Sequence, residues 1–175
     1  AEFHLTRKPR GREHSSAGFF SSGPAHPHRR ASGGNGSYMD QRGISAFIVA
    51  GGKGRRFGGD KALFRYRDRA LIEHVIDAVR PAIANIAIVA DDAARFDYLG
   101  LPCYPDAIPG AGAFGGVYTA LLRSETGRAF VTACDMPWLN TDLIRFIASI
   151  SEGHDVTIPA VRGEWEPLQI GRAHV

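Results

Sequence analysis

The sequence predicts a three-layer α/β domain built around a mostly parallel sheet. Apolar runs rich in β-branched residues alternate along the chain with segments whose apolar residues recur at helical spacing. This order is typical of parallel strands joined by helices. The length of 175 residues allows one domain with a substantial core. A glycine-rich, cationic turn follows the first apolar run, and ligands of such domains gather at the carboxyl ends of the strands.

Residues 1–38 are predicted to be disordered, to be non-native and to lie outside this domain. They are rich in Gly, Ser, Pro, Arg and His and show no extended apolar periodicity, so burial cannot offset the entropy of ordering them. They hold six cations and two acids, whereas the whole chain carries only +3. The remaining residues are therefore slightly acidic, and we expect no nucleic-acid partner. Met39 precedes the first strand and marks the expected start of the domain.

The composition also bears on the location of the protein. No run of 18 or more apolar residues is present, so we expect no membrane-spanning helix. The two cysteines, Cys103 and Cys134, give no disulfide framework. Their number favours a reducing, cytoplasmic setting.

The first strand and the turn after it form the most informative stretch, residues 44–61 (ISAFIVAGGKGRRFGGDK). Its first residues are apolar and typical of a buried strand. Five glycines then alternate with four cations: Gly51, Gly52, Gly54, Gly58 and Gly59 with Lys53, Arg55, Arg56 and Lys61. Glycines let backbone N–H groups approach a ligand, and the cations supply charge-assisted donors to phosphate oxygens. We therefore predict a polyphosphate-binding loop.

Two better-known phosphate loops do not fit this stretch. The P-loop requires G-x-x-x-x-G-K-[ST], and no Gly-Lys pair here is followed by Ser or Thr. The dinucleotide fingerprint G-x-G-x-x-G fails because Phe57 stands at its third glycine. A dinucleotide site is the alternative interpretation, with Asp91 or Asp92 after the second strand as the ribose ligand. The separation of these acids from Gly58 exceeds the usual ~20 residues, which favours a solvated turn.

The later elements alternate in the same way. Helical spacing predicts a helix over residues 71–79 that ends before Pro81, followed by a second buried strand over 86–90. Residues 101–104 are a candidate third strand, and the glycine-rich segment 109–116 leads into a further helix. The apolar face of that helix is expected to comprise Phe114, Val117, Tyr118, Leu121 and Leu122. A fourth strand over 129–134, a helix from Thr141 and a strand near 155–160 complete the order.

Asp135 directly follows the fourth predicted strand. A carboxylate at the carboxyl end of a strand, across from a polyphosphate loop, is a natural ligand for Mg²⁺. The alternative is that Asp135 caps the helix that follows.

Four stretches of the chain resemble the molybdenum cofactor guanylyltransferase family. Residues 50–52 (AGG) and 56–61 (RFGGDK) are similar to its signature A-G-G-x-x-x-R-[MF]-G-x-D-K. Residues 106–116 are similar to D-x-x-x-x-G-P-L-[AG]-G, with Ala113 and Phe114 in place of the usual proline and leucine. Residues 134–137 (CDMP) match C-D-x-P, in which the aspartate holds the metal, and residues 163–168 resemble the segment before P-L-H-A.

The resemblance covers about residues 43–168 and implies a Rossmann-like nucleotidyltransferase fold. It implies transfer of GMP from GTP to molybdopterin with release of pyrophosphate, and Mg²⁺ as the cofactor. The implied catalytic residues are Arg56, Lys61 and Asp135, and Asp135 is the implied metal ligand. The implied nucleotide-binding residues are Val49, Ala50, Gly51, Gly52, Lys61, Asp106 and Asp135. Molybdoenzyme maturation proteins are implied as further partners.

The chain departs from the family at its carboxyl end. Family members continue with further helices, whereas residues 169–175 (QIGRAHV) match nothing that the resemblance leads us to expect. The domain, residues 39–168, is therefore expected to be truncated, which leaves its own activity open. Transfer of CMP to molybdopterin, or another small-molecule nucleotidyl transfer, is the alternative within the same fold. A non-catalytic nucleotide-binding fragment is the alternative of a different class.

Overall fold

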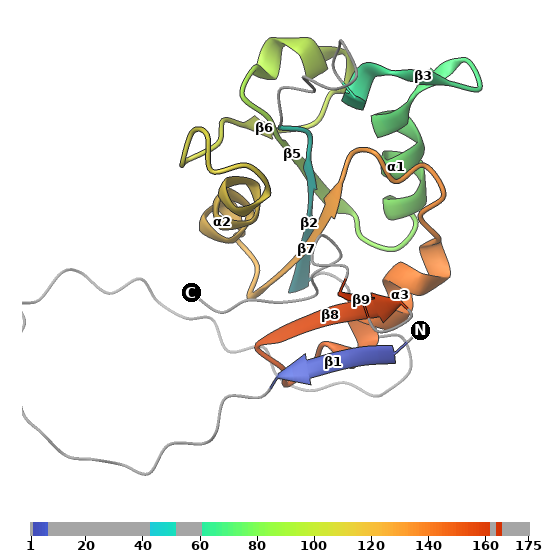
Figure 1. The fold of residues 1–175 in the computed structure, drawn as a ribbon, viewed down its shortest axis with the longest axis vertical. Helices are drawn as coiled ribbons and strands as arrows, with labels where there is room; N and C mark the ends of the chain where they lie inside the picture. The colour runs from blue at the N-terminus through green and yellow to red at the C-terminus, as the bar shows by residue number, and fades with distance from the viewer. Residues whose placement is uncertain (1, 7–42, 52–60, 162–163, 166–175) are drawn as a thin grey trace, which may run out of the picture.

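A four-stranded parallel sheet forms the centre of the computed structural model, which describes residues 2–6, 43–51, 61–161 and 164–165. Its strands are β2 (Ile44–Val49), β5 (Asn85–Val89), β6 (Cys103–Tyr104) and β7 (Arg128–Ala133). They lie in the order β6-β5-β2-β7, and every pair is parallel (Figure 1). β2 is therefore an interior strand, paired with β5 on one side and with β7 on the other.

Helices cover both faces of this sheet. α1 (Leu71–Val79) and α3 (Thr141–Ile150) lie on one face, and α2 (Ala113–Arg123) lies on the other (Figure 1). Side chains of β2 alternate between the two layers: Ile44, Ala46 and Ile48 pack with α1 and α3, whereas Phe47 and Val49 pack with α2. The predicted three-layer α/β fold is confirmed.

The two helices on the first face have the predicted apolar pattern and local caps. α1 ends before Pro81 and buries its apolar stripe. At its start, the Ala70 N–H donates to Glu73 Oε2 at 2.7 Å, which satisfies one of the backbone donors that a helix start leaves without an intrahelical partner. α3 begins after Asn140, whose side-chain oxygen accepts the N–H groups of Asp142 and Leu143 at 2.8 and 3.1 Å.

α2 packs on the sheet mainly through small residues, and the predicted apolar face of this helix is only partly correct. The buried positions are Gly115, Gly116, Thr119 and Ala120, and the predicted residues Val117 and Leu121 pack beside them, partly buried. The other three predicted residues are exposed instead: Phe114 is 68% exposed, Tyr118 43% and Leu122 54%. The reason is a close approach, because a Cβ atom on Gly116 would collide with Val49 Cγ1. Bulky side chains at the contact would hold α2 away from β2.

The remaining elements are short and lie at the borders of the sheet. β3 (Arg65–Tyr66) and β4 (Arg69–Ala70) form an antiparallel hairpin that follows the 3₁₀ turn η2 (Lys61–Leu63). A second turn of this type, η3 (Ala93–Leu99), precedes β6. Among the described residues, no helix has the length and apolar character needed to cross a membrane.

A second, antiparallel sheet corrects two sequence-based expectations. β8 (Val156–Val161), predicted near residues 155–160, pairs with β1 (Glu2–Thr6) and with β9 (Glu164–Trp165), outside the parallel sheet. Disorder throughout residues 1–38 is therefore wrong at residues 2–6. Without β1, this edge of β8 would expose unpaired backbone groups, and the short alternation in Glu2–Thr6 suits a strand. Residues 1, 7–42 and 166–175 lie outside the described residues, so the domain bounds 39–168 and 169–175 stay predictions.

Gly116→Ala should destabilise the protein because of the close approach between α2 and β2. The added methyl group meets the side chain of Val49, and overpacking of this kind costs about 1–3 kcal/mol. Urea unfolding followed by circular dichroism measures the loss. Gly127→Ala is the matched control, since nothing lies within 4 Å of a Cβ atom there, and its effect should stay within about 0.5 kcal/mol. Equal stability of the two variants would contradict this account of the α2 interface.

Candidate functional site

The carboxyl ends of the parallel strands meet at one edge of the sheet. Backbone hydrogen bonds continue to this edge: the Ala50 N–H donates to Val89 O at 2.8 Å, and the Cys134 N–H donates to Val49 O at 3.1 Å. The chain passes from β2 through α1 to β5 on one side, and from β6 through α2 back to β7 on the other. The order of strands thus reverses between β2 and β7. In open α/β sheets, such a switch point is where ligands bind.

Lys61 and Asp135 meet at this switch point. Lys61 begins η2, Asp135 follows β7, and Lys61 Nζ lies 3.4 Å from Asp135 Oδ2. The two side chains are 46% and 41% exposed. A pair this long and this exposed contributes little to stability, and both groups are accessible to a ligand. The sequence assigned these two residues to one site, and the structure brings them together.

The chemistry of Asp135 fits a magnesium ion that the substrate helps to hold. Among the described residues, no group of three or more His, Cys, Asp or Glu side chains could enclose a metal. Mg²⁺ does not require such a cage, because it is usually held by one or two carboxylates together with substrate phosphates and water. A single exposed carboxylate beside a cation that can contact the same phosphates matches this mode.

Asp106 is held in place by α2. Its Oδ1 accepts the Ile108 N–H at 3.0 Å and lies 3.3 Å from the Thr119 hydroxyl. The carboxylate packs over Gly115, where a Cβ atom would come within 2.8 Å of the carboxyl carbon. Asp106 therefore follows β6 at the same edge of the sheet, with its position fixed by α2. Its predicted contact with the nucleoside stays a prediction.

Thr119 is a functional candidate that the sequence did not indicate. It is fully buried, and its hydroxyl lies 2.8 Å from Gly115 O and accepts the Ala107 N–H at 2.9 Å. These contacts tie the loop after β6 to α2. The only signal in the sequence is a threonine one helical turn after a glycine, which is too common to be informative.

The other predicted nucleotide-binding residues fall into two groups. Val49, Ala50 and Gly51 lie at the switch point; the Val49 side chain is buried against α2, and Gly51 is exposed. Val49 can therefore offer a ligand only its backbone. Gly52 and Arg56 lie outside the described residues, as does most of the predicted polyphosphate-binding loop.

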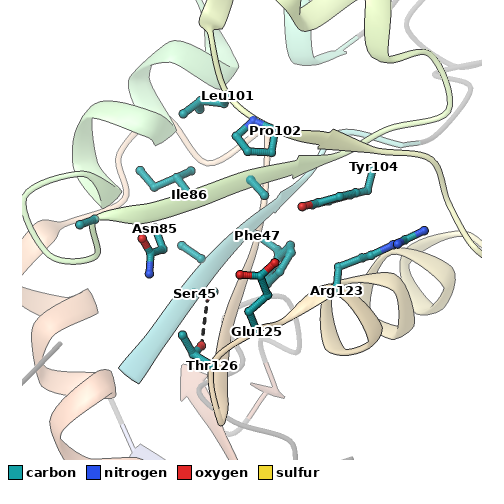
Figure 2. Close-up of a pocket in the computed structure, with 13 residues that line it drawn as sticks. Ser45, Phe47, Asn85, Ile86, Leu101, Pro102, Tyr104, Arg123, Glu125 and Thr126 are labelled. Carbon is teal, nitrogen blue, oxygen red and sulfur yellow. Dashed lines mark hydrogen bonds between the residues drawn. The ribbon is translucent and has the colours of Figure 1, made fainter. Parts of the chain in front are cut away.

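A cavity of about 440 Å³ lies elsewhere, mostly toward the amino ends of the strands. Figure 2 shows Ser45 at the start of β2, Asn85 at the start of β5 and Thr126 before β7 around it. Ser45 and Thr126 are joined through their hydroxyl groups at 3.0 Å (Figure 2). The predicted site residues lie at the opposite ends of these strands, so this cavity is not the switch-point site.

Neither Cys103 nor Cys134 forms a disulfide bond. Burial, aided by the negative charge of Asp97, raises the pKa of the Cys103 thiol, which keeps it in the neutral, unreactive form. Cys134 is buried beside Asp135. Neither residue has the environment of a nucleophile.

The fold and the switch-point edge define a Rossmann-like α/β domain of the nucleotide-binding type. Residues 46–175 match the family described as the MobA-like NTP transferase domain. The chain belongs to this family.

Relatives in sequence carry consistent names. The chain is 38% identical to a "Probable molybdenum cofactor guanylyltransferase" of Carboxydothermus hydrogenoformans, over 71% of this chain and 63% of that protein. It is 39% identical to the molybdenum cofactor guanylyltransferase of Pasteurella multocida, over 57% of this chain and 54% of that protein. The matched region therefore spans less than two thirds of the length of these relatives.

A solved structure agrees with this assignment. The molybdopterin-guanine dinucleotide biosynthesis protein A of Archaeoglobus fulgidus superposes with a TM-score of 0.61 at 26% identity. The match covers 74% of this chain and 67% of that one. A protein of Aquifex aeolicus superposes with a TM-score of 0.63 at 25% identity, and the match covers 74% of this chain and 69% of that one. The predicted family and nucleotidyltransferase fold are confirmed.

Thr119→Val should destabilise the loop that carries Asp106. Valine keeps the size of the side chain but removes the acceptor of the Ala107 N–H and the hydroxyl beside Asp106, and a lost buried partner costs about 1–3 kcal/mol. Thr119→Ser retains the hydroxyl and serves as the control. Chemical unfolding of both variants measures the difference. A serine variant that loses as much stability as the valine variant would assign the effect to the methyl group rather than to the hydrogen bonds.

Proposed function

We propose that this protein transfers GMP from GTP to molybdopterin and releases pyrophosphate. The observation that carries the proposal is the Lys61–Asp135 pair at the switch point of a chain that belongs to the MobA-like NTP transferase family. A cation for phosphates and a carboxylate for a metal lie side by side at the edge where α/β sheets bind nucleotides. The names of the relatives support guanosine as the nucleoside and the molybdenum cofactor as the acceptor.

The reaction makes modest chemical demands on the protein. An oxygen of the acceptor's phosphate forms a bond to the α-phosphorus of GTP, and the bond from that phosphorus to the bridging oxygen of pyrophosphate breaks. The attacking phosphate is already ionised, so no general base is needed. Catalysis then depends on alignment of the two phosphates and on neutralisation of their charge. Exposed charged side chains at the end of a rigid sheet can supply both.

The proposed roles follow from the positions of the residues. Lys61 binds the β- and γ-phosphates, and Asp135 is the residue that would hold Mg²⁺, which supplies further charge neutralisation at the phosphate oxygens. Arg56 and Gly52 lie outside the described residues, and the family resemblance implies that Arg56 adds a phosphate contact and that Gly52 lies against the nucleoside. Ala50 and Gly51 offer backbone groups to the nucleoside from β2, and Asp106 contacts it from β6.

The pairing of Lys61 with Asp135 is compatible with an exchange of partners when the nucleotide binds. In the free protein, each side chain partly neutralises the other at 3.4 Å. With Mg·GTP bound, Asp135 would hold the cation and Lys61 would contact the phosphates, so each charge would have a new partner of opposite sign. Because the original pair is exposed, its loss costs little.

We also propose a cytoplasmic location, in line with two cysteines that form no disulfide bond. Titration with GTP, CTP, ATP and UTP in the presence of Mg²⁺ tests the nucleoside. Release of pyrophosphate on addition of molybdopterin tests the reaction. A preference for CTP would show that the transferred group is CMP rather than GMP. Nucleotide binding without release of pyrophosphate would show that the chain is a nucleotide-binding domain without catalytic activity.

Asp135→Asn should remove most Mg²⁺-dependent turnover while the fold stays intact. The amide has the shape of the carboxylate but lacks its charge, and the loss of one electrostatic contact to developing charge lowers the rate by about 10²–10³. Pyrophosphate release at saturating GTP measures the effect. Asp142→Asn, an exposed carboxylate on α3, is the matched control and should retain parental turnover. Parental activity of Asp135→Asn at matched circular dichroism would rule out the metal role.

Lys61→Ala should weaken the binding of GTP more than the binding of GMP. The proposed partners of Lys61 are the β- and γ-phosphates, which GMP lacks, and a charged hydrogen bond is worth about 1.5–3 kcal/mol. Calorimetric titration with each nucleotide gives the two ratios. Arg80→Ala removes an exposed cation at the end of α1 and should change neither affinity. An equal loss of affinity for GTP and GMP would instead show that Lys61 contacts the nucleoside or has a structural role.

A further inference from the structure

An exposed tryptophan stands beside the proposed catalytic pair. Trp138 is 77% exposed, more than any other large hydrophobic side chain in the part of the chain that the structure describes. Tryptophan is highly buried on average in folded proteins. A ring exposed to this degree at the edge of a candidate site is therefore a feature that packing does not explain.

The ring of Trp138 packs against the ring of Tyr66. Tyr66 contacts it edge to face, with ring centroids 5.5 Å apart and an interplanar angle of 69°. Tyr66 is itself held by His74, whose ring lies 5.6 Å away and whose Nε2 lies 2.8 Å from Tyr66 O. The Leu139 N–H closes the turn around Trp138 by donating to Met136 O at 3.1 Å. Such edge-to-face contacts are favourable in addition to burial, so they hold the ring in place before a ligand binds.

The chain joins both members of this aromatic pair to the switch point. Tyr66 follows Lys61 through η2, where the Phe64 N–H donates to Lys61 O at 3.2 Å. Trp138 lies three residues after Asp135 in the sequence. The segment after the phosphate loop and the segment after β7 are therefore linked twice, once by the Lys61–Asp135 pair and once by the Tyr66–Trp138 rings.

The order of the strands separates two halves of the edge. Asp106 follows β6, at one border of the sheet, and contacts the start of α2 where that helix packs on Val49 of β2, whereas Asp135 and Trp138 follow β7, at the opposite border. Lys61 contacts Asp135, which places the phosphate-binding cation on the β7 side of β2. If the nucleoside lies toward Asp106 and the reacting phosphates lie at Lys61, the half of the edge that remains for the second substrate is the one that carries Trp138.

We propose that Trp138, supported by Tyr66, is the surface on which the planar ring of the acceptor stacks. The inference rests on the proposed function, in which that ring is a pterin. A stacked ring beside Asp135 holds the phosphate of the acceptor near the α-phosphate of the nucleotide. The Arg67 guanidinium, 5.3 Å from the centroid of the Tyr66 ring, adds a positive charge next to the same surface, which suits an anionic acceptor.

Titration with 6-hydroxymethylpterin monophosphate tests the stacking surface. Trp138→Ala should weaken its binding about tenfold, since the bound ring loses its aromatic stacking partner. Trp138→Phe keeps a ring and should stay within about threefold of the parent. Phe146→Ala, which removes another exposed aromatic ring from α3, is the control and should bind as the parent does. All four proteins should bind Mg·GTP with equal affinity.

A spectroscopic readout distinguishes stacking from a structural effect. The chain has two tryptophans, so Trp165→Phe leaves Trp138 as the only indole. Its fluorescence should be quenched by the pterin phosphate and should not change on addition of inorganic phosphate.

Three results would overturn the proposal while the parent still binds Mg·GTP: no binding of the pterin phosphate to the parent, parental pterin affinity in Trp138→Ala, or an equal loss of GTP affinity in that variant. Failure of the parent to bind Mg·GTP would instead remove the proposed function.

Discussion

The parallel pairing of β2 with both β5 and β7 is the constraint on which the rest of the structure depends. Because the three strands run in the same direction and in register, the residues that follow them emerge at one edge. Gly51 and Asp135 thus come to the same edge of the sheet, although the intervening chain contains two α-helices and three further strands of the same sheet. The Lys61–Asp135 contact is a consequence of this register, since a shift by one residue would turn the strand's buried side chains to the opposite layer.

The second constraint is the close packing of α2 on β2. Gly116 lets the helix approach Val49, and Gly115 makes room for the Asp106 carboxylate. Thr119, from the next turn of α2, then reaches the loop after β6. Three small residues of one helix therefore connect the central strand to an acid at the border of the sheet. Bulky residues at these positions would hold the helix off the sheet and release Asp106 from its present position.

Much of the fold and the main pair of site residues could be predicted from the sequence. Apolar periodicity located β2, β5, β7, α1 and α3, and residue chemistry at strand ends pointed to Lys61 and Asp135. The face of α2 was predicted only at Val117 and Leu121, because the helix packs mainly through small residues, which leave no bulky apolar period in the sequence. Strand β1 was missed because five alternating residues lie in a polar, glycine-rich surrounding. The Tyr66–Trp138 contact joins residues far apart in the sequence, and only the folded chain shows that they meet.

The topology of the sheet also determines when the protein can fold. β2 is made early, yet its partners come from residues 85–89 and 128–133, so its pairing is entirely non-local. Contacts between distant segments slow folding, since the entropy of closing long loops must be lost before any pairing is gained. During synthesis on the ribosome, the apolar strand β2 lacks a pairing partner on one edge until β7 has emerged. A nascent chain with an unpaired apolar strand is prone to aggregate, and chaperones counter aggregation of this kind.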